Sequence, residues 1–498
     1  MNSHDLLETV ERRRQSTLQS LDPATQVSLG QYFTPHAAAT LIASMPTLPM
    51  SGSLKILDPG AGTGSLAASM VARILAESPE LHVHLVALEI DEQVAVHLRQ
   101  TMADLEATVA GTSLVLTTEV LVDDFVDPHG QLDDDFDLVI MNPPYAKLPA
   151  ASRHRAAMAQ LGVQTPNIYA AFLARATLML KQGGQVVAIT PRSFTNGVYF
   201  EPFRQFFLDR MAIDHIHVFD SRSTVFSDTG VLQENIIFNA VRGGFVDQVE
   251  LTASIGHEDE VRLKSVAYGD IVRPTDARNF IRIPVGDEDD AIVAMMLDLP
   301  TTLHDLGVTV STGRVVDFRS RENLIPGVTA GFPMVYPANI KHGLVEHPKD
   351  NAKPQWFNFV EESDHKWLVP SGTYVLIKRF SSKEEHRRIV AGIWSNTSNP
   401  DCPVAFDNKL NYIHCSGEGL DAELAAGLSI WLNSGPVDKY FRTFSGHTQV
   451  NATDLREMRY PTAAELRYLG YGHNGELPSQ EAIDQSVMSI LGWKEVAA

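Results

Sequence analysis

Four consecutive residues, Asn142-Pro143-Pro144-Tyr145, carry the clearest chemical pattern in the chain. They follow an apolar stretch over residues 136–141 that is typical of a buried strand. The two prolines hold the backbone extended and keep their carbonyl oxygens out of sheet pairing. The Asn142 side-chain oxygen and the Pro143 carbonyl can therefore accept both hydrogens of one planar –NH₂ group, while Tyr145 offers a flat face for a ring. The pattern indicates chemistry on a planar –NH₂ group rather than a loop that only ends a strand.

A glycine-rich loop comes earlier, Asp58-Pro59-Gly60-Ala61-Gly62-Thr63-Gly64-Ser65, between a strand and a helix. Its glycines let the backbone approach a ligand closely, and the helix N-terminus adds unpaired N–H donors. The spacing G-x-G-x-G departs from the G-x-G-x-x-G of dinucleotide sites. Glu89 ends the next apolar strand, where a carboxylate can accept hydrogen bonds from ribose hydroxyls. Loop and carboxylate together predict a nucleotide-type cofactor rather than a tight turn without a ligand.

These motifs need an alternating frame of strands and helices to position them. The predicted strands are residues 55–58, 82–90, 114–120, 136–141, 185–190, 213–219 and 235–241. The predicted helices are residues 65–76, 92–110 and 166–180, the last stopped by Gly183-Gly184. Such alternation predicts parallel βαβ units in an α/β, doubly wound sheet, with catalytic groups at the carboxyl ends of the strands. A second domain begins between about residues 243 and 300, with short β-rich stretches such as 374–380.

The net charge of −21 argues against a nucleic-acid partner only when the chain is taken whole. Residues 1–299 hold 21 basic against 38 acidic side chains, whereas residues 300–460 hold 17 against 18. The second half is therefore close to neutral. Two cysteines, Cys402 and Cys415, do not make a disulfide framework or a structural zinc site, and we expect no metal. The chain shows no secretory signal or long apolar run, so a cytoplasmic location without membrane contact is expected.

The order of these motifs resembles the gamma-class DNA adenine-N6 methyltransferases of type II restriction–modification systems, the group that includes the Taq-type modification enzymes. The shared elements are Gly30-Gln31-Tyr32-Phe33-Thr34-Pro35, the glycine loop, Glu89, Asp124-Phe125 and the Asn-Pro-Pro-Tyr loop. Phe226 is a looser match to the family's base-contacting aromatic region. Residues 311–314, 374–394 and 445–451 resemble segments of the family's recognition domain, and Pro59-Gly60 departs from the commonest glycine-loop form.

The resemblance implies a Rossmann-like, S-adenosylmethionine-dependent methyltransferase domain, with a mostly parallel sheet, followed by an α+β target-recognition domain. The implied divisions are a helical extension over residues 1–28, a catalytic domain over 29–290, and a DNA-binding domain with a C-terminal tail over 291–498. About 28 residues precede Leu29, and no nuclease motif stands out. Modification alone is expected, by a monomer that works beside a separate cognate restriction endonuclease.

The resemblance also assigns cofactor-binding residues. They are Tyr32, Thr34, Pro35, Asp58, Gly60, Gly62, Gly64, Glu89, Ile90, Asp124, Phe125 and Asn142. Thr34 and Pro35 would close over the methionine carboxylate, and the three glycines would let the methionine part pass. Glu89 would hold the ribose, while Ile90 and Phe125 would pack on the adenine ring. Asp124 would accept the exocyclic amine of the cofactor, although Asp123 beside it remains an alternative.

For the reaction, the resemblance implies an adenine flipped out of duplex DNA, because its amine is unreachable inside the helix. Asn142 and Pro143 would bind the N6 hydrogens and concentrate electron density on nitrogen, so that it attacks the sulfonium methyl in line. Tyr145 would stack on the base, with Phe226 as a candidate second wall, while Pro143 and Pro144 hold the loop extended. Neither cysteine takes part. Asn before Pro-Pro favours adenine over the similar amine of cytosine.

Basic residues in the second half are the expected DNA contacts. They are Arg314, Lys378, Arg379, Lys383, Arg387 and Arg388. Phosphates need Lys or Arg, and base edges are read by Arg, Lys, Asn and Gln. The alternative is a solvated helix with pairs such as Glu384–Arg388. Two other functions stay open at this point: methylation of a glutamine amide in a protein, and a non-catalytic DNA specificity protein.

Overall fold

The computed structural model divides into two compact units, Met1–Val285 and Gly286–Ala498. It describes residues 2–21, 33–130, 132, 134–219, 234–256, 260–274, 276, 278–286, 289–327, 329–349, 353–381, 386–396, 399–445, 449–473 and 476–493. Among these residues, no helix combines the length and the apolar character needed to cross a membrane. The boundary predicted between residues 290 and 291 falls inside the first helix of the second unit, α10 (Asp289–Leu297).

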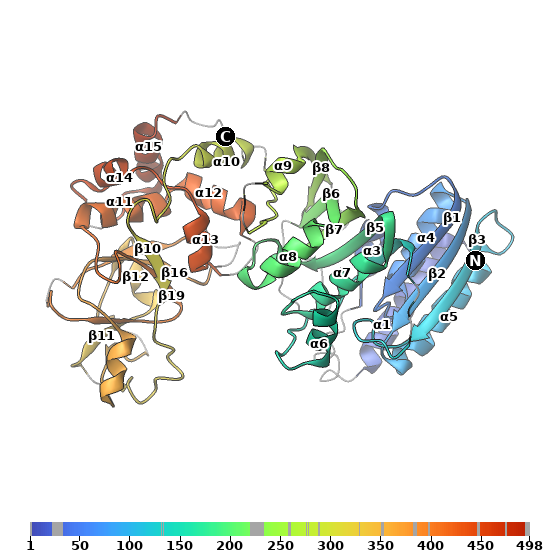
Figure 1. Ribbon diagram of the computed structural model, residues 1–498, viewed down its shortest axis with the longest axis horizontal. Helices are drawn as coiled ribbons and strands as arrows, with labels where there is room; N and C mark the ends of the chain where they lie inside the picture. The colour runs from blue at the N-terminus through green and yellow to red at the C-terminus, as the bar shows by residue number, and fades with distance from the viewer. Residues whose placement is uncertain are drawn as a thin grey trace. The chain divides into compact units, whose positions relative to one another are not determined.

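The first unit is built on one nine-stranded sheet with the order β3-β2-β1-β4-β5-β7-β6-β8-β9 (Figure 1). Its strands are β1 (Ser51–Pro59), β2 (Glu80–Glu89), β3 (Val115–Val122), β4 (Phe136–Met141), β5 (Leu180–Pro191), β6 (Met211–Phe219), β7 (Asn235–Arg242), β8 (Gln248–Ser254) and β9 (Arg262–Ala267). Strands β1 to β5 pair in parallel, whereas β7 runs antiparallel between β5 and β6. The predicted α/β fold class is confirmed, with an antiparallel strand inserted into the mostly parallel sheet.

Helices cover both faces of this sheet. They are α1 (Ser3–Ser20), α3 (His36–Ser44), α4 (Ser65–Glu77), α5 (Glu92–Val109), α6 (Arg153–Gln160), α7 (Ile168–Met179), α8 (Glu201–Leu208) and α9 (Tyr268–Ile271), with 3-10 turns η1 (Arg192–Thr195) and η2 (Val198–Phe200). In β1, Ile56 packs into a core with α1, α3, α4 and α5, while its neighbour Leu57 packs into a second core with α7 and α8. Adjacent strand residues face opposite sides, so the sheet is buried on both.

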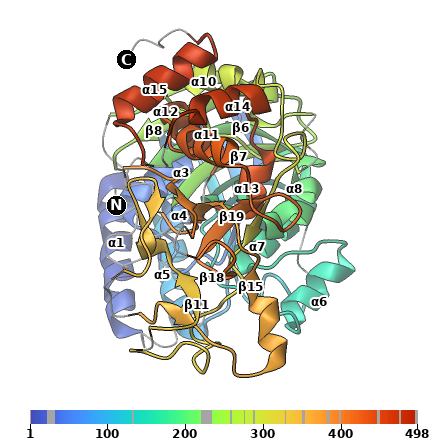
Figure 2. The ribbon, with the colours of Figure 1, turned by 90° about the vertical axis from the view of Figure 1, so that its left-hand side faces the viewer.

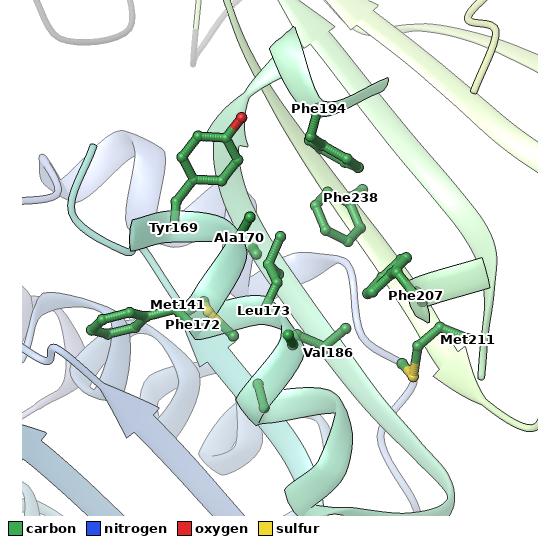
Figure 3. Close-up of a cluster of buried hydrophobic side chains, with 14 of the residues drawn as sticks. Met141, Tyr169, Ala170, Phe172, Leu173, Val186, Phe194, Phe207, Met211 and Phe238 are labelled. Atoms are coloured by element: carbon green, nitrogen blue, oxygen red, sulfur yellow. The ribbon is translucent and has the colours of Figure 1, made fainter. Parts of the chain in front are cut away.

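The second of these cores is rich in aromatic side chains. Figure 3 shows Phe194, Phe207 and Phe238 grouped beside Leu173 of α7. The ring centroids of Phe194 and Phe238 lie 5.5 Å apart, and those of Phe207 and Phe238 lie 5.9 Å apart. These rings on one face and a mainly aliphatic core on the other face hold the central strands rigid, which fixes the loops at their carboxyl ends.

The role predicted for Gly183-Gly184 is wrong. Helix α7 already ends at Met179, and both glycines lie inside β5. There, Phe136 of β4 pairs with Leu180 while Leu138 pairs with Gln185, so the register shifts across the glycines. Gly183 has a φ of +79°. The pair forms a bulge in the strand rather than a helix stop, because a left-handed residue interrupts sheet pairing as effectively as it interrupts a helix.

The second unit is α+β. A six-stranded sheet has the order β10-β19-β16-β17-β13-β12, and a four-stranded sheet has the order β14-β11-β18-β15. The strands are β10 (Thr309–Thr312), β11 (Phe332–Val335), β12 (Ile340–Lys341), β13 (Leu344–Val345), β14 (Trp356–Phe357), β15 (Leu368–Val369), β16 (Tyr374–Lys378), β17 (Ala391–Trp394), β18 (Val404–Phe406) and β19 (Leu410–His414). The predicted β-rich stretch at 374–380 thus forms the central strand β16.

Helices gather at one end of this second unit, away from β11, β15 and β18 (Figure 2). They are α11 (Ala422–Leu432), α12 (Gly435–Phe444), α13 (Ala452–Glu457), α14 (Ala463–Gly470) and α15 (Gln480–Ile490), joined by α10; short turns η3 (Pro337–Asn339) and η4 (Glu362–Trp367) lie among the strands. Gly427 of α11 permits a close crossing, because a Cβ there would lie 1.8 Å from the Leu466 carbonyl oxygen of α14. The unit therefore has a helical layer and a strand layer of its own.

Candidate active site

The carboxyl ends of β1 to β4 meet at one edge of the first unit's sheet and enclose a cavity of about 270 Å³. Its lining includes Gly60, Gly62, Glu89, Ile90, Asp123, Asp124, Phe125, Asn142 and Pro144. A smaller pocket of about 20 Å³ adjoins it and includes Phe33, Thr34, Gly62 and Asn142. The structure thus places most of the sequence-predicted cofactor residues around one cavity. Tyr32, Phe226 and Lys383 lie outside the described residues.

The glycine loop has a backbone that only glycine adopts easily. Gly62 and Gly64 have φ values of +58° and +88°. A Cβ on Gly62 would lie 2.8 Å from Cδ1 of Phe33, and a Cβ on Gly64 would lie 2.9 Å from Cγ2 of Thr101. The loop therefore sits tightly between the segment at Phe33 and helix α5, and any side chain would push one of them away.

Glu89, the last residue of β2, holds the glycine loop by a hydrogen bond to its backbone. Its Oε2 accepts a hydrogen bond from the Gly62 amide at 2.9 Å, and its Oε1 accepts from the Asp91 amide at 3.0 Å. The side chain is buried, and this burial raises the pKa of Glu89. A buried carboxylate at this strand end therefore both fixes the loop and borders the cavity.

Asp58 is fully buried at the end of β1. Among the described residues, neither of its carboxyl oxygens makes a hydrogen bond of ordinary length and angle, although the backbone N–H of Ala67 in α4 interacts with the carboxyl. Burial raises the pKa of Asp58 to about 8; the backbone N–H of Ala67 acts to lower it, and the nearby carboxylate of Glu89 acts to raise it further. A buried polar group without a well-aligned partner is costly, so such groups usually mark a functional site. Here the group stands directly before the glycine loop, two residues ahead of the cavity-lining Gly60 but not itself part of the lining.

Asp124 and Asp123 both border the cavity but have different partners. Asp124 Oδ2 lies 2.8 Å from Arg153 and 2.6 Å from His154 Nε2, while its Oδ1 accepts from the Val126 amide. Burial acts to raise the pKa of Asp124, but the bond to His154 and its charge lower it overall. For Asp123, slight burial also acts upward, yet hydrogen bonds from His129 lower the pKa to about 2. Both are ionised acceptors near neutral pH.

Asn142 and Tyr145 are held together at the end of β4. The Asn142 amide nitrogen donates to Thr34 Oγ1 at 3.0 Å, and its Oδ1 accepts from the Tyr145 hydroxyl at 2.9 Å. The Tyr145 hydroxyl also lies 3.3 Å from the Ile189 carbonyl oxygen, and its ring meets Tyr169 edge-on at 6.4 Å. Burial and the neighbouring Tyr169 raise the pKa of Tyr145, so it remains a neutral donor.

Several residues around the cavity carry no recognisable sequence signal. These lining residues include Leu88, Lys147, Leu148, Pro149, Ser152, His154, Ile168 and Phe172. Phe172 packs on Phe125 with centroids 5.0 Å apart and shields that side of the cavity. Ile168 and Phe172 are one helical turn apart on α7, whose apolar sequence gave no indication of which face reaches the site. Phe33 had a signal, because it lies inside the motif shared with the resembled family.

The basic residues predicted for DNA contact differ in their surroundings. Arg314 is exposed and donates to the Leu368 carbonyl oxygen at 2.7 Å. Lys378 and Arg379 are half-buried at the end of β16, and burial lowers the pKa of Arg387, which donates to the Asn433 carbonyl oxygen. These four remain candidates.

Arg388 departs from the sequence interpretation. Arg388 is only 1% exposed. Its guanidinium lies 3.3 Å from Ser445 Oγ and 5.6 Å from the ring centroid of Phe441. Its backbone lies outside any helix, so the solvated-helix alternative does not apply to it. We correct its assignment from DNA contact to internal support of α12, because a guanidinium enclosed in this way does not reach a phosphate.

Comparisons with known proteins cover nearly the whole chain. A family model described as "Eco57I restriction-modification methylase" matches residues 91–226. The type II methyltransferase M.BsuBI of Bacillus subtilis is 38% identical over 98% of both chains. The type II methyltransferase M.PstI of Providencia stuartii is 36% identical over 96% of both chains. The structure of the type IIL restriction-modification enzyme MmeI in complex with DNA aligns with a TM-score of 0.54 at 12% identity, over 89% of this chain and 71% of that chain, which supports the fold.

Proposed function

The chain belongs to the type II restriction–modification methyltransferases, and from this premise we propose that it methylates N6 of adenine in duplex DNA. The single observation that carries the proposal is the placement of Asn142. It borders both the 270 Å³ cavity and the adjoining pocket, with its side-chain amide oriented by Thr34 and Tyr145. An amine acceptor is thereby fixed at the edge of a cofactor-sized space.

The cavity fits S-adenosylmethionine in three respects. A Cβ on Gly62 would strike Phe33, the lining includes the apolar side chains of Ile90, Phe125 and Phe172, and the buried Asp58 carboxyl stands directly before the glycine loop. Asp58 would hold the ammonium of the methionine part, Glu89 the ribose, and Ile90 with Phe125 the adenine. Asp124 or Asp123 would accept the exocyclic amine. When bound, this cofactor supplies an electrophilic methyl group on sulfur.

The residues of the Asn-Pro-Pro-Tyr loop would act by positioning and polarising the substrate amine. Asn142 Oδ1 has a second lone pair beside the one that Tyr145 uses, so it accepts one amine hydrogen without losing that bond. The Pro143 carbonyl accepts the other hydrogen. These two acceptors draw electron density onto nitrogen and hold it in one orientation, which supplies positioning and electrostatic stabilisation. The ring of Tyr145 would face the base, with Pro144 behind it and Phe226 as the proposed second wall.

Duplex DNA is the proposed partner, contacted by the second unit. Arg314, Lys378, Arg379, Arg387 and Lys383 are the proposed contacts. A type II methyltransferase has a protective role when a cognate restriction endonuclease acts on the same sequence, so we propose such an enzyme as a separate chain. We further propose that the protein acts as a monomer in the cytoplasm, because the reaction needs one cofactor site and one flipped base.

The deciding experiment gives the purified chain methyl-labelled S-adenosylmethionine with plasmid DNA or with a protein extract. Label on DNA, recovered as N6-methyladenine after digestion to nucleosides, is the expected result. Recovery as N4-methylcytosine would replace the base assignment, and label on protein would support the glutamine-amide alternative. Absence of label from both, with DNA still bound, would support a non-catalytic specificity protein. Methylation-sensitive sequencing of DNA from expressing cells then gives the recognition sequence.

A further inference from the structure

Helix α1 lies before every motif that resembles the methyltransferase family, yet it contacts the elements around the cofactor cavity. Three consecutive arginines, Arg12, Arg13 and Arg14, occur in its middle. We propose that Arg13 and Arg14 are positioning residues that set the cofactor affinity of the site. This inference rests on the proposed use of S-adenosylmethionine and adds α1 to the cofactor-binding machinery.

Arg14 and Glu11 hold the segment that carries Phe33 and Thr34. Arg14 is 2% exposed, forms a bidentate pair with Glu11 at 2.8 and 2.9 Å, and lies 3.5 Å from the Phe33 carbonyl oxygen. Glu11 Oε2 accepts from the His36 amide at 3.2 Å. Pro35, the N-cap residue of α3, provides no side-chain cap, so the Glu11 carboxylate from α1 satisfies that helix end instead.

Arg13 reaches the glycine loop through one intermediate. Its guanidinium donates to Thr101 Oγ1 at 2.7 Å and pairs with Asp104 at 2.6 Å. The Thr101 hydroxyl in turn donates to the Thr63 carbonyl oxygen of the loop at 2.7 Å. The Arg13 side chain is 15% exposed, so this bond is largely shielded from water.

The two connections end on two segments in contact with each other: the segment with Phe33 and the glycine loop with Gly62 and Thr63. Arg14 ends at Phe33 and Arg13 ends at Thr63, and a Cβ on Gly62 would already touch the Phe33 ring. Small movements of either segment therefore change the space beside the glycine loop. If α1 served packing alone, its apolar residues Leu6 and Val10 would suffice, because burying guanidinium groups costs desolvation energy.

The test measures the dissociation constant of S-adenosylmethionine by calorimetry for the full chain and five variants. Arg14→Gln and Arg13→Gln are each expected to raise it about tenfold, the loss expected for a charge-assisted hydrogen bond. The KM for the cofactor should rise in parallel, while kcat at saturating cofactor stays within about twofold of wild type. Arg12→Gln is the matched control, since Arg12 bonds within its own helix to Thr9 and Glu8 and should leave the affinity unchanged.

Thr101→Val guards against loss of folding, because it removes the hydroxyl while keeping shape and leaves α1 intact. It should weaken cofactor binding about threefold, and Arg14→Lys should recover part of the affinity lost in Arg14→Gln. The inference is overturned if wild type binds the cofactor and Arg13→Gln, Arg14→Gln and Thr101→Val all bind it equally well, or if only the melting temperature falls. A wild-type chain that binds no S-adenosylmethionine would instead refute the proposed cofactor, and this inference with it.

Discussion

The Tyr145 hydroxyl donates to Asn142 Oδ1 across 2.9 Å, so the tyrosine orients the amide that follows β4. The amide nitrogen of Asn142 donates to Thr34 Oγ1, and Thr34 lies two residues before the start of α3. Two partners from separate segments thus leave the Asn142 side chain with one orientation. Such preorganisation favours an amine acceptor, because the Asn142 side chain then needs no reorientation when the reaction takes place.

Asn142→Ala is expected to lower kcat by about 10²–10³-fold, the usual loss for one preorganised electrostatic partner. Binding of S-adenosylmethionine should stay within a few-fold, because most of the cavity wall remains. Methyl transfer and calorimetric binding of the cofactor are the two measurements, performed on the same preparation. Turnover comparable to wild type would contradict the proposed mechanism.

Asp58→Asn should change the pH dependence of stability. The folded pKa of about 8 lies above the usual 3.8, so between these values the folded protein keeps a proton that the unfolded chain loses. The free energy of unfolding of the wild type therefore falls as pH rises through this window. Asparagine does not ionise, so the melting temperature of the variant relative to wild type should increase from pH 5 to pH 8.

Scanning calorimetry without cofactor provides this comparison. Parallel melting curves at both pH values would contradict the assigned burial of Asp58. Added S-adenosylmethionine should stabilise wild type more than Asp58→Asn at pH 8, because only the ionised carboxylate attracts an ammonium group.

Gly62→Ala should weaken cofactor binding by more than about tenfold, since its Cβ would displace Phe33 from the cavity wall. Gly111→Ala is a matched control, with φ +82° and open space around the added carbon. Gly111→Ala should cost only the left-handed backbone strain of about 1–2 kcal/mol. Its melting temperature should therefore fall while its cofactor affinity stays normal. Equal cofactor affinity in the two variants would argue against contact between the loop and the ligand.

Arg314→Glu should weaken binding to all DNA sequences and reduce the slope of log K against log salt by about 1. Arg388→Leu should leave that slope unchanged and instead lower the free energy of unfolding by about 1–3 kcal/mol, because it leaves polar partners unsatisfied. DNA titrations at several salt concentrations and chemical denaturation separate the two effects. A reduced slope in Arg388→Leu would show that its burial is not maintained in solution.

Sequence alone was sufficient for the strand-end motifs, because parallel strands bring their carboxyl ends together whatever the details of packing. Asn142, Glu89 and Asp124 therefore fall around one cavity as the order of motifs predicts. Burial and long-range partners were not predictable in the same way. In the sequence, Arg388 is one more cation in a basic run. Its burial depends on α12, about fifty residues further along the chain.

The same reason explains what the sequence interpretation missed in the N-terminal helix. Arg12, Arg13 and Arg14 are identical in type, and only the packing of α1 on α4 and α5 decides which of them point inward. Likewise, Gly183-Gly184 marks an interruption that the local pattern does not identify as a bulge or a helix end. Local chemistry predicts that a feature exists, and tertiary packing decides its kind.

The strand order has a consequence for how such a protein can diversify. Reading outward from β4, the ends of β1, β2 and β3 lie on one side, whereas β5, β7 and β6 lie on the other. The glycine loop, Glu89 and Asp124 all belong to the first side, and Asn142 stands at the dividing strand. Ile168 and Phe172 of α7 complete the cavity wall, but among the described residues none of β5, β6 or β7 lines it. Substitutions in those three strands can therefore accumulate without replacing any side chain of the cavity wall.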